Sequence, residues 1–364
     1  MMIEHPISYP STVDVVSEKP FFTVHTHLLY DQFTKSNKTT LIAPLSLDHL
    51  IGMIYPLYGE QDQKILLSKA FGTSDEQVIL RYLKKTLTDY PSLKIGNCVA
   101  TNLDIQDLHH HLDQLKVTPF SLNDEAIVSK MNDFVGEKTE GLIGSIVQDR
   151  RDLPSNGLVA INAGSFIGKF DQPFNPELTR KETFVTDQKE PLSLDMMWGM
   201  KWVNYFECDQ FQYIELPLEN GQYLLKLILP KEDQSIQQIW PLHPLGISNI
   251  FSAISGHNLA KRLLVEILLP KFKVNQSQEL LGALVGYEMP LLRETTCGRL
   301  ASIMQKTLFE LEEGGVKAAF VTSGFFKTTI DKPIPKHQIH FKRTFAFELT
   351  TVDFVPIMTG IFNG

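Results

Sequence analysis

Residues 312–333 read Glu312-Glu-Gly-Gly-Val-Lys-Ala-Ala-Phe-Val-Thr-Ser-Gly-Phe-Phe-Lys-Thr-Thr-Ile-Asp-Lys-Pro333. An acidic start with paired glycines leads into small and β-prone side chains. Between Gly315 and Lys332 there is no proline, so every backbone N–H can join a sheet, whereas Pro333 and Pro335 lack this donor. The stretch therefore predicts a hinge followed by a strand without a partner, which can enter a sheet as far as about Lys332.

Side chains alternate between the two faces of a strand. Only one register of this strand keeps the charged Lys317 in solvent. The residues of the opposite set are then expected to face a core: Val316, Ala318, Phe320, Thr322 and Gly324.

Three motifs follow one another along the chain. They are Leu41-Ile-Ala-Pro-Leu-Ser-Leu47, Ile161-Asn-Ala-Gly-Ser-Phe-Ile-Gly-Lys-Phe-Asp-Gln-Pro-Phe174, and a third made of Gln305-Lys306, Glu313, Gly315, Ala318-Ala319 and Thr322. In this order they resemble motifs of the serpin family, and the third is similar to the proximal hinge of that family. The resemblance covers the chain from about Phe21 onward, and the order of several motifs makes it far more specific than any one of them.

Long helices in the first part of the chain and crowded strands in the second predict an α+β fold. The resemblance implies one serpin-like domain over residues 21–364, with about eight or nine helices and three β-sheets, after a loosely ordered lead-in over residues 1–20. An exposed reactive-centre loop is expected over about residues 315–338. One local expectation is a helix over Gln276–Leu284.

The resemblance implies a monomeric inhibitor of serine or cysteine proteases, not an enzyme, with no cofactor and no metal. The loop acts as bait: a protease cuts it and forms an acyl-enzyme through its own nucleophile. Insertion of the loop into the central sheet then distorts the attached protease. The implied hinge residues are Glu313, Gly314, Gly315, Val316, Lys317, Ala318, Ala319, Phe320, Val321 and Thr322.

The position of the cut differs between two ways of counting. Counting from Glu313 puts it after Thr329, whereas counting back from Phe341-Lys-Arg-Thr-Phe345 points to about Pro333. A bond before proline resists most proteases, so the reactive centre is assigned to Lys327, Thr328, Thr329 and Ile330. Lys327 suits a trypsin-like enzyme and Thr329 an elastase-like one, and Phe325 or Phe326 suits a chymotrypsin- or cathepsin-like one; a subtilisin-like target stays open.

Some positions depart from the family pattern. Phe320 stands where small residues are usual, and overpacking of this kind costs about 1–3 kcal/mol. Gln305 replaces a buried histidine of the shutter region, and Phe170 replaces a tryptophan, whereas Ser46 and Asn162 remain. Because of Phe320 and Gln305, a non-inhibitory serpin that acts as a protease substrate or binding module stays open as the alternative.

Composition excludes other classes of function. With 34 Lys and Arg against 42 Asp and Glu, the net charge is −8, and no basic stripe indicates nucleic-acid binding. Cys98, Cys208 and Cys297 are too scattered for a disulfide framework or zinc site and are expected to be free thiols. The run His109–His111 is expected to be a solvated surface; a metal-dependent hydrolase built on it is the remote alternative.

Motifs of enzymes and of export are missing from the sequence. Gly164-Ser-Phe-Ile-Gly168 is one residue out of register for a nucleophile elbow, and its glycines are interpreted as sites of close backbone packing. Neither a secretory signal nor an 18-residue apolar run is visible, so no membrane contact and a cytoplasmic location are expected. Release by a non-classical route stays open.

Overall fold

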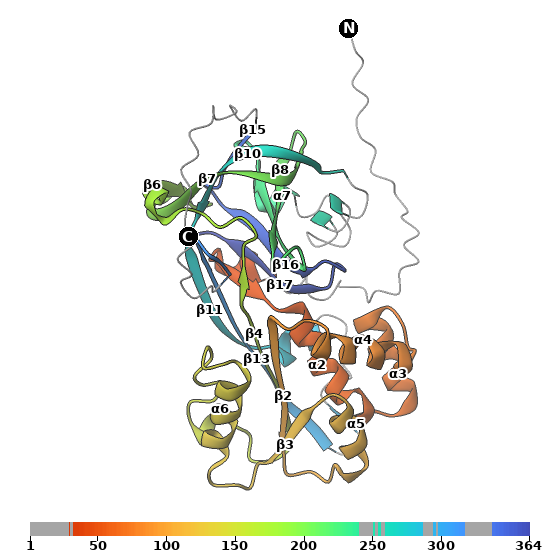
Figure 1. The fold of residues 1–364 in the computed structure, drawn as a ribbon. Coiled ribbons are helices and arrows are strands. Elements are labelled where there is room, and N and C mark those ends of the chain that lie inside the picture. The colour runs from red at the N-terminus through yellow and green to blue at the C-terminus, as the bar shows by residue number, and fades with distance from the viewer. Residues whose placement is uncertain are drawn as a thin grey trace.

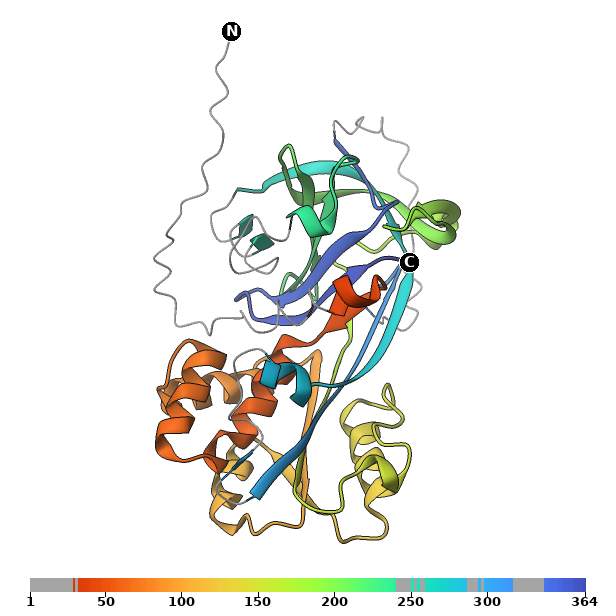
Figure 2. The same ribbon diagram turned by 180° about the vertical axis from the view of Figure 1, so that it is seen from behind.

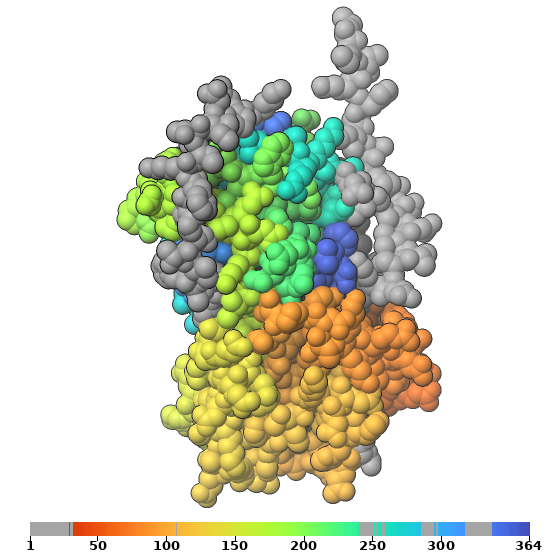
Figure 3. Space-filling model, viewed as in Figure 1, coloured from red at the N-terminus to blue at the C-terminus, as the bar shows by residue number. Residues whose placement is uncertain are grey.

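Two β-sheets and a group of helices make up the computed structural model of the protein (Figure 1). The structure describes residues 29, 32–239, 250–251, 254–255, 259–286, 294–295, 298–316 and 337–364. One sheet fills the upper part of the molecule, and the other runs downward among the helices, as the view from behind also shows (Figure 2). The two parts share one continuous surface (Figure 3).

The helices lie mainly in the lower part. They are α2 (Pro44–Ile54), α3 (Glu60–Phe71), α4 (Glu76–Thr88), α5 (His109–Gln114), α6 (Ile127–Lys138), α7 (Ile236–Ile239) and α9 (Leu281–Gly286). Helix α2 begins at Pro44, whose missing N–H costs nothing in a first turn, and all its residues are buried. Helix α4 is capped by Asp75, whose carboxylate accepts hydrogen bonds from two backbone N–H groups.

The lower sheet has the strand order β3-β2-β4-β13-β14-β5, and β11 and β12 also pair with β13. Its strands are β2 (Leu93–Thr101), β3 (Val117–Ser121), β4 (Leu158–Phe166), β5 (Gly168–Lys169), β11 (Phe272–Glu279), β12 (Glu294–Thr295), β13 (Gly298–Glu312) and β14 (Gly315–Val316). Every residue of β4 is buried because α2 packs on one face and α6 on the other. This strand therefore lies in the middle of the molecule.

The upper sheet has the order β1-β17-β16-β9-β8-β7-β10-β15, with β6 paired to β7. Its strands are β1 (Thr40–Ile42), β6 (Arg180–Val185), β7 (Pro191–Glu207), β8 (Phe211–Leu218), β9 (Tyr223–Pro230), β10 (Lys261–Pro270), β15 (His337–His340), β16 (Phe345–Thr351) and β17 (Pro356–Phe362). The described strands thus form two sheets where three were expected. The reason is the 17-residue strand β7. Its first part pairs with β6 and its last part pairs with β8, so β7 joins these strands into one sheet.

The predicted α+β fold is confirmed, and one local prediction is wrong. Instead of a helix over Gln276–Leu284, strand β11 continues to Glu279 and helix α9 begins at Leu281. Strand β11 pairs along its whole length with β13, and this ladder outweighs the local helix preference. None of the described helices is long and apolar enough to span a membrane.

Candidate functional site: the hinge and the seam between two strands

The hinge lies at the upper end of β13. After Glu312 the chain reverses through Glu313 and Gly314, and β14 runs back antiparallel to β13. Gly315 has φ +142°, and a Cβ there would lie 2.2 Å from the carbonyl oxygen of Gly168. Only glycine can occupy this position, because both the backbone angle and the close approach exclude a side chain.

Strand β14 lies between β13 and β5. Val316 is level with Leu311 on one side and with Gly168 on the other, and we call this row of three residues the fork. Val316 is 1% exposed, as the alternation of the sequence predicts. The backbone N–H of Phe170 donates to the carbonyl oxygen of Gly314 at 2.9 Å. The first two residues of the expected mobile strand are therefore already part of the sheet.

The side chain of Glu313 holds the hinge from outside. Its carboxylate accepts a hydrogen bond from Thr179 Oγ1 at 2.7 Å and pairs with Lys271 Nζ at 2.8 Å. Partial burial raises the pKa of Glu313, but the hydrogen bonds from Lys271 and Thr179 outweigh it and leave the pKa below its usual value. The turn is thus fixed by an ionised carboxylate.

Below the fork, β4 and β13 pair directly with each other as parallel strands. We call this line of contact the seam; along it Gly164 is level with Thr307, and Asn162 with Gln305. Within the described residues, no strand separates β4 from β13 below Val316. The lower sheet is therefore closed along the seam and open only at its upper end.

The predicted shutter residues meet at this seam. Gln305 donates to the carbonyl oxygen of Ala43 at 3.0 Å and accepts from the N–H of Ala43 at 3.2 Å. Ser46 Oγ donates to Asn162 Oδ1. Both strands of the seam are thereby bound to the start of α2, and the amide of Gln305 supplies a donor and an acceptor at once.

The continuation of this network was not predicted from the sequence. Asn162 donates to Asn97 Oδ1 at 2.7 Å, and Asn97 donates to His49 Nδ1 at 3.2 Å. His49 Nε2 lies 2.8 Å from Thr86 Oγ1, which itself donates to the carbonyl of Leu83, so Nε2 carries the proton. Burial lowers the pKa of His49 to about 3 and keeps it neutral. A signal existed: Ser46 and His49 are polar residues of a buried, otherwise largely apolar helix.

Phe170 lies behind the hinge. It is 5% exposed and meets the ring of Phe174 edge to face, with the centroids 5.8 Å apart. The N–H of Phe174 donates to the carbonyl oxygen of Glu313 at 2.9 Å. Lys201 of β7 lies over the ring of Phe174, with Nζ 4.0 Å from its centroid. Lys201 also donates to the carbonyls of Gln172 and Pro173, and burial lowers its pKa to about 7.

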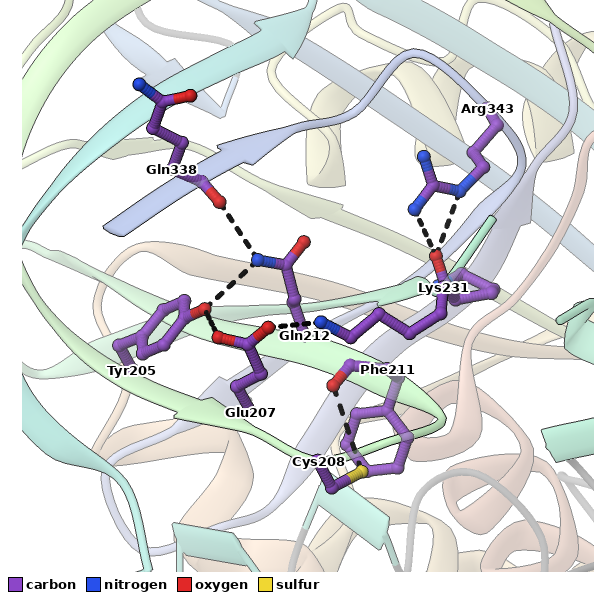
Figure 4. Close-up of polar contacts among 9 residues, drawn as sticks. Tyr205, Glu207, Cys208, Phe211, Gln212, Lys231, Gln338 and Arg343 are labelled. Atoms are coloured by element: carbon purple, nitrogen blue, oxygen red, sulfur yellow. Dashed lines mark hydrogen bonds and ion pairs between the residues drawn. The ribbon is translucent and has the colours of Figure 1, made fainter. Parts of the chain in front are cut away.

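Strand β15 holds the chain on the far side of the loop. It pairs in parallel with β10, and Gln212 donates to the carbonyl oxygen of Gln338 at 2.9 Å (Figure 4). The same amide donates to the hydroxyl of Tyr205 at 3.0 Å, which in turn donates to Glu207. The expected loop over about residues 315–338 is thus anchored in a different sheet at each end.

The other predicted site residues lie outside the described residues. These are the hinge residues Lys317, Ala318, Ala319, Phe320, Val321 and Thr322 and the reactive-centre residues Lys327, Thr328, Thr329 and Ile330. Cys297 also falls outside, whereas Cys98 is a buried free thiol and Cys208 a half-buried one. In the histidine run, His109 and His110 are exposed, and His111 lies 2.7 Å from the carbonyl of Gly52 and packs against Tyr55.

A comparison with known families supports what this geometry suggests. The family described as "Serpin (serine protease inhibitor)" matches residues 23–353, which include the hinge, the seam and both anchors of the loop. The chain belongs to the serpin family. Serpins are generally protease inhibitors without enzymatic activity.

Relatives of this serpin are distant in sequence. Neuroserpin of Gallus gallus is 24% identical, over 80% of this chain and 78% of its own. A serine protease inhibitor of Cyanea capillata is 26% identical, over 70% of this chain and 71% of its own. At these identities the relatives leave the target of this serpin open.

Solved structures share the fold of this serpin. The thermophilic serpin tengpin in its native state has a TM-score of 0.82 at 20% identity, covering 100% of this chain and 97% of its own. Human thyroxine-binding globulin, solved with its ligand, has a TM-score of 0.79 at 17% identity, covering 93% of this chain and 96% of its own. A thermophilic serpin and a thyroxine-binding globulin therefore match the fold of the chain about equally well.

Proposed function

We propose that this serpin inhibits a serine or cysteine protease by a suicide-substrate mechanism. The protease cuts within Lys327–Ile330, and the segment from Val316 onward inserts along the seam while the protease is held as an acyl complex. The protease supplies the nucleophile, and the serpin supplies a cleavable bond and a rapid change of shape.

The fork is the observation that carries this proposal. Val316 already lies between β13 and β5, and β5 continues the line of β4. The offset between the two long strands is the same at the fork, where Leu311 is level with Gly168, as at the seam, where Thr307 is level with Gly164. A strand that continues downward from Val316 therefore meets both neighbours in register without a bulge.

The energy for insertion has to come from more than hydrogen bonds. A strand residue gains about 1 kcal/mol from its ladder hydrogen bond, whereas ordering its backbone costs about 1–2 kcal/mol. The difference is supplied by burial of side chains such as Val316 and by relief of strain in the uncut sheet. The uncut state is then held kinetically, by the closed seam, and not by equilibrium.

The anchors at both ends of the loop support a mechanism that needs a cut. Val316 belongs to the lower sheet and His337 to the upper one, and β15 is fixed to β10 along its length. While the chain between them is intact, the segment after Val316 is tethered at both ends. Cleavage frees one end and leaves the other fixed at the hinge.

A second candidate is a serpin that binds or is cut by a protease without trapping it. It is favoured by Phe320, a bulky residue in the inserting segment. The similarity to thyroxine-binding globulin adds weight, because that protein is named for a ligand and not for a protease. In this case a protease would cleave the loop and dissociate in its active form.

Incubation with trypsin, elastase, subtilisin and cathepsins separates the two candidates. A covalent complex that survives boiling in detergent is expected for at least one protease, and mass spectrometry of the released fragment locates the cut. Nicking by every protease without a complex would overturn the inhibitory function and favour the second candidate. A catalytically dead protease variant serves as the control, because it cannot form the acyl bond.

A further inference from the structure

We propose that a cavity at the turn between β6 and β7 binds a small anionic ligand, a molecule that carries a carboxylate or a phosphate group. The cavity has a volume of about 470 Å³. Pockets of this size hold small molecules in other proteins. The site is a second, separate property of the molecule and does not depend on protease trapping.

Three segments far apart in the sequence form the walls of the cavity. They are the turn after β6 (residues 185–189), the chain from the end of β9 to α7 (residues 230–237) and the chain between β15 and β16 (residues 342–344). The first and third are joined directly, because the N–H of Val185 donates to the carbonyl oxygen of Lys342 at 2.8 Å and Val185 forms a β-bridge with Arg343. Backbone contacts thus hold the cavity open before a ligand arrives, which lowers the cost of binding.

Arg343 brings a half-buried positive charge to the wall of the cavity (Figure 4). Its Nε and Nη2 donate to a single acceptor, the carbonyl oxygen of Pro230, at 2.9 and 2.5 Å. A guanidinium has five N–H donors, and within the described chain Nη1 has no acceptor and Arg343 forms no ion pair. Burial lowers the pKa of Arg343, so the charged form lacks the stabilisation that an anion in the cavity would supply.

Thr186 supplies a second unused donor. It lines the cavity and is only 6% exposed. Its Oγ1 accepts a hydrogen bond from the N–H of Glu190 at 3.1 Å, and no described residue accepts the proton of this hydroxyl. A nearly buried hydroxyl usually donates as well as accepts, so an oxygen atom of a ligand would complete its bonding.

Lys189 is the third donor and belongs to the same turn. Its N–H donates to the carbonyl oxygen of Thr186 at 2.9 Å, its side chain lines the cavity, and it forms no ion pair with a described residue. The backbone of Lys189 is left-handed, with φ +66°. Glycine or asparagine fits such a position with less strain. The presence of a lysine is therefore explained better by its side chain than by the turn.

Two acidic residues of the wall weaken anion binding without preventing it. Asp187 accepts a hydrogen bond from the amide of Gln237 at 2.8 Å. Glu232 is exposed, so water and salt screen its charge. The ammonium group of Lys342 is already paired with Glu182 at 2.8 Å. The guanidinium, the free ammonium group and the hydroxyl proton remain, and charge-assisted donors of this kind suit the oxygen atoms of a carboxylate or a phosphate equally.

Citrate and inorganic phosphate are suitable probes, because Gln234 and Ser235 also line the cavity and can bond to hydroxyl groups. Isothermal titration calorimetry of the full-length protein, in a buffer without other polyanions, should show saturable binding of at least one probe at millimolar or lower concentration. The tighter probe shows whether the site prefers a carboxylate or a phosphate.

Three substitutions assign this binding to the cavity. Lys189→Ala should weaken it about tenfold, as expected for the loss of one charge-assisted hydrogen bond. Thr186→Val should weaken it by a smaller factor, because only a neutral donor is lost. Glu232→Gln should strengthen it, because a like charge is removed. Lys181→Ala is the matched control: this exposed lysine of β6 does not line the cavity, and its removal should leave the affinity unchanged.

Hydrogen exchange locates the site independently of any substitution. The N–H of Val185, which joins two walls of the cavity, should exchange more slowly when the probe is bound. The site is ruled out if neither probe binds, if Lys189→Ala and Lys181→Ala bind equally well, or if exchange at Val185 does not slow. None of these results bears on the inhibition of a protease, which the covalent complex tests separately.

Discussion

Gln305 of β13 and Asn162 of β4 are level with each other on adjacent parallel strands, and each bonds to the start of the same helix, α2. Gln305 holds the backbone of Ala43 through both its amide oxygen and its amide nitrogen. Asn162 accepts from Ser46. The seam is thus closed by bonds to a third element as well as by its own ladder.

Replacing Gln305 by alanine should weaken this closure. The N–H of Ala43, which is 4% exposed, would lose its partner, whereas the carbonyl of Ala43 would keep the N–H of Leu47; an unsatisfied buried polar group costs about 1–3 kcal/mol. Unfolding in urea measures the loss. Gln114→Ala in α5, whose amide oxygen accepts a hydrogen bond from the exposed Lys84, should change the free energy of unfolding by less than about 0.5 kcal/mol. Equal losses in both variants would mean that Gln305 has no special role.

Gly315→Ala should displace β14 from the fork. The new Cβ would lie 2.2 Å from the carbonyl oxygen of Gly168, and φ of +142° adds strain of about 1–3 kcal/mol. Hydrogen exchange at the N–H of Val316 reports whether the strand leaves the sheet, and it should accelerate. Gly144→Ala, where a Cβ meets nothing within 4 Å, is the control. Unchanged exchange at Val316 would show that β14 can move without leaving the fork.

The buried Lys201 should make stability depend on pH. Its pKa is lowered from 10.5 to about 7 by burial, so the unfolded chain binds a proton between these values that the folded protein does not. Stability therefore rises from about pH 7 to pH 10.5, by an amount of the order of a few kcal/mol. Lys201→Met should remove most of this rise in urea unfolding. Lys84→Met in α4, which replaces an exposed lysine, should keep it; a rise that survives in Lys201→Met belongs to other groups.

His49 predicts a second pH dependence at acid pH. Its pKa falls from 6.5 to about 3 on folding, because burial excludes the charged form. Only the unfolded chain then takes up the proton, so stability decreases as pH falls from 6.5 toward 3. His49→Gln should flatten this slope relative to the wild type, with the exposed His110→Gln as the control. If stability depends on pH with the same slope in His49→Gln and His110→Gln, then His49 is not a neutral imidazole in the folded network.

Much of the fold followed from local patterns. Pro44 before a buried apolar run predicts the start of α2, and Thr73-Ser-Asp-Glu76 predicts the cap of α4; both are present. The apolar run Leu158–Phe166 favours a strand, and β4 spans these residues. The helix expected over Gln276–Leu284 failed because the partner of β11 is β13, which no local window contains.

The site was predicted only in part, and for the same reason. Ser46, Asn162, Gln305 and Phe170 could be named from motifs, but Asn97, His49 and Thr86 join them only across three separate elements. A hydrogen bond between residues far apart in the chain produces no periodic pattern in the sequence from which it could be predicted. Lys201 was missed likewise, because its burial depends on the segment around Phe174 folding over it.

The sequence by itself determined that residues after Glu312 form a proline-free, alternating segment that a sheet can accept, because backbone donors and side-chain alternation are local properties. Only the tertiary structure decided where that segment begins its pairing. Val316 pairs with Leu311 of β13 and with Gly168 of β5, and this register depends on how the two strands are offset along the sheet. Register is a relation between strands, and it exists only once the strands are packed together.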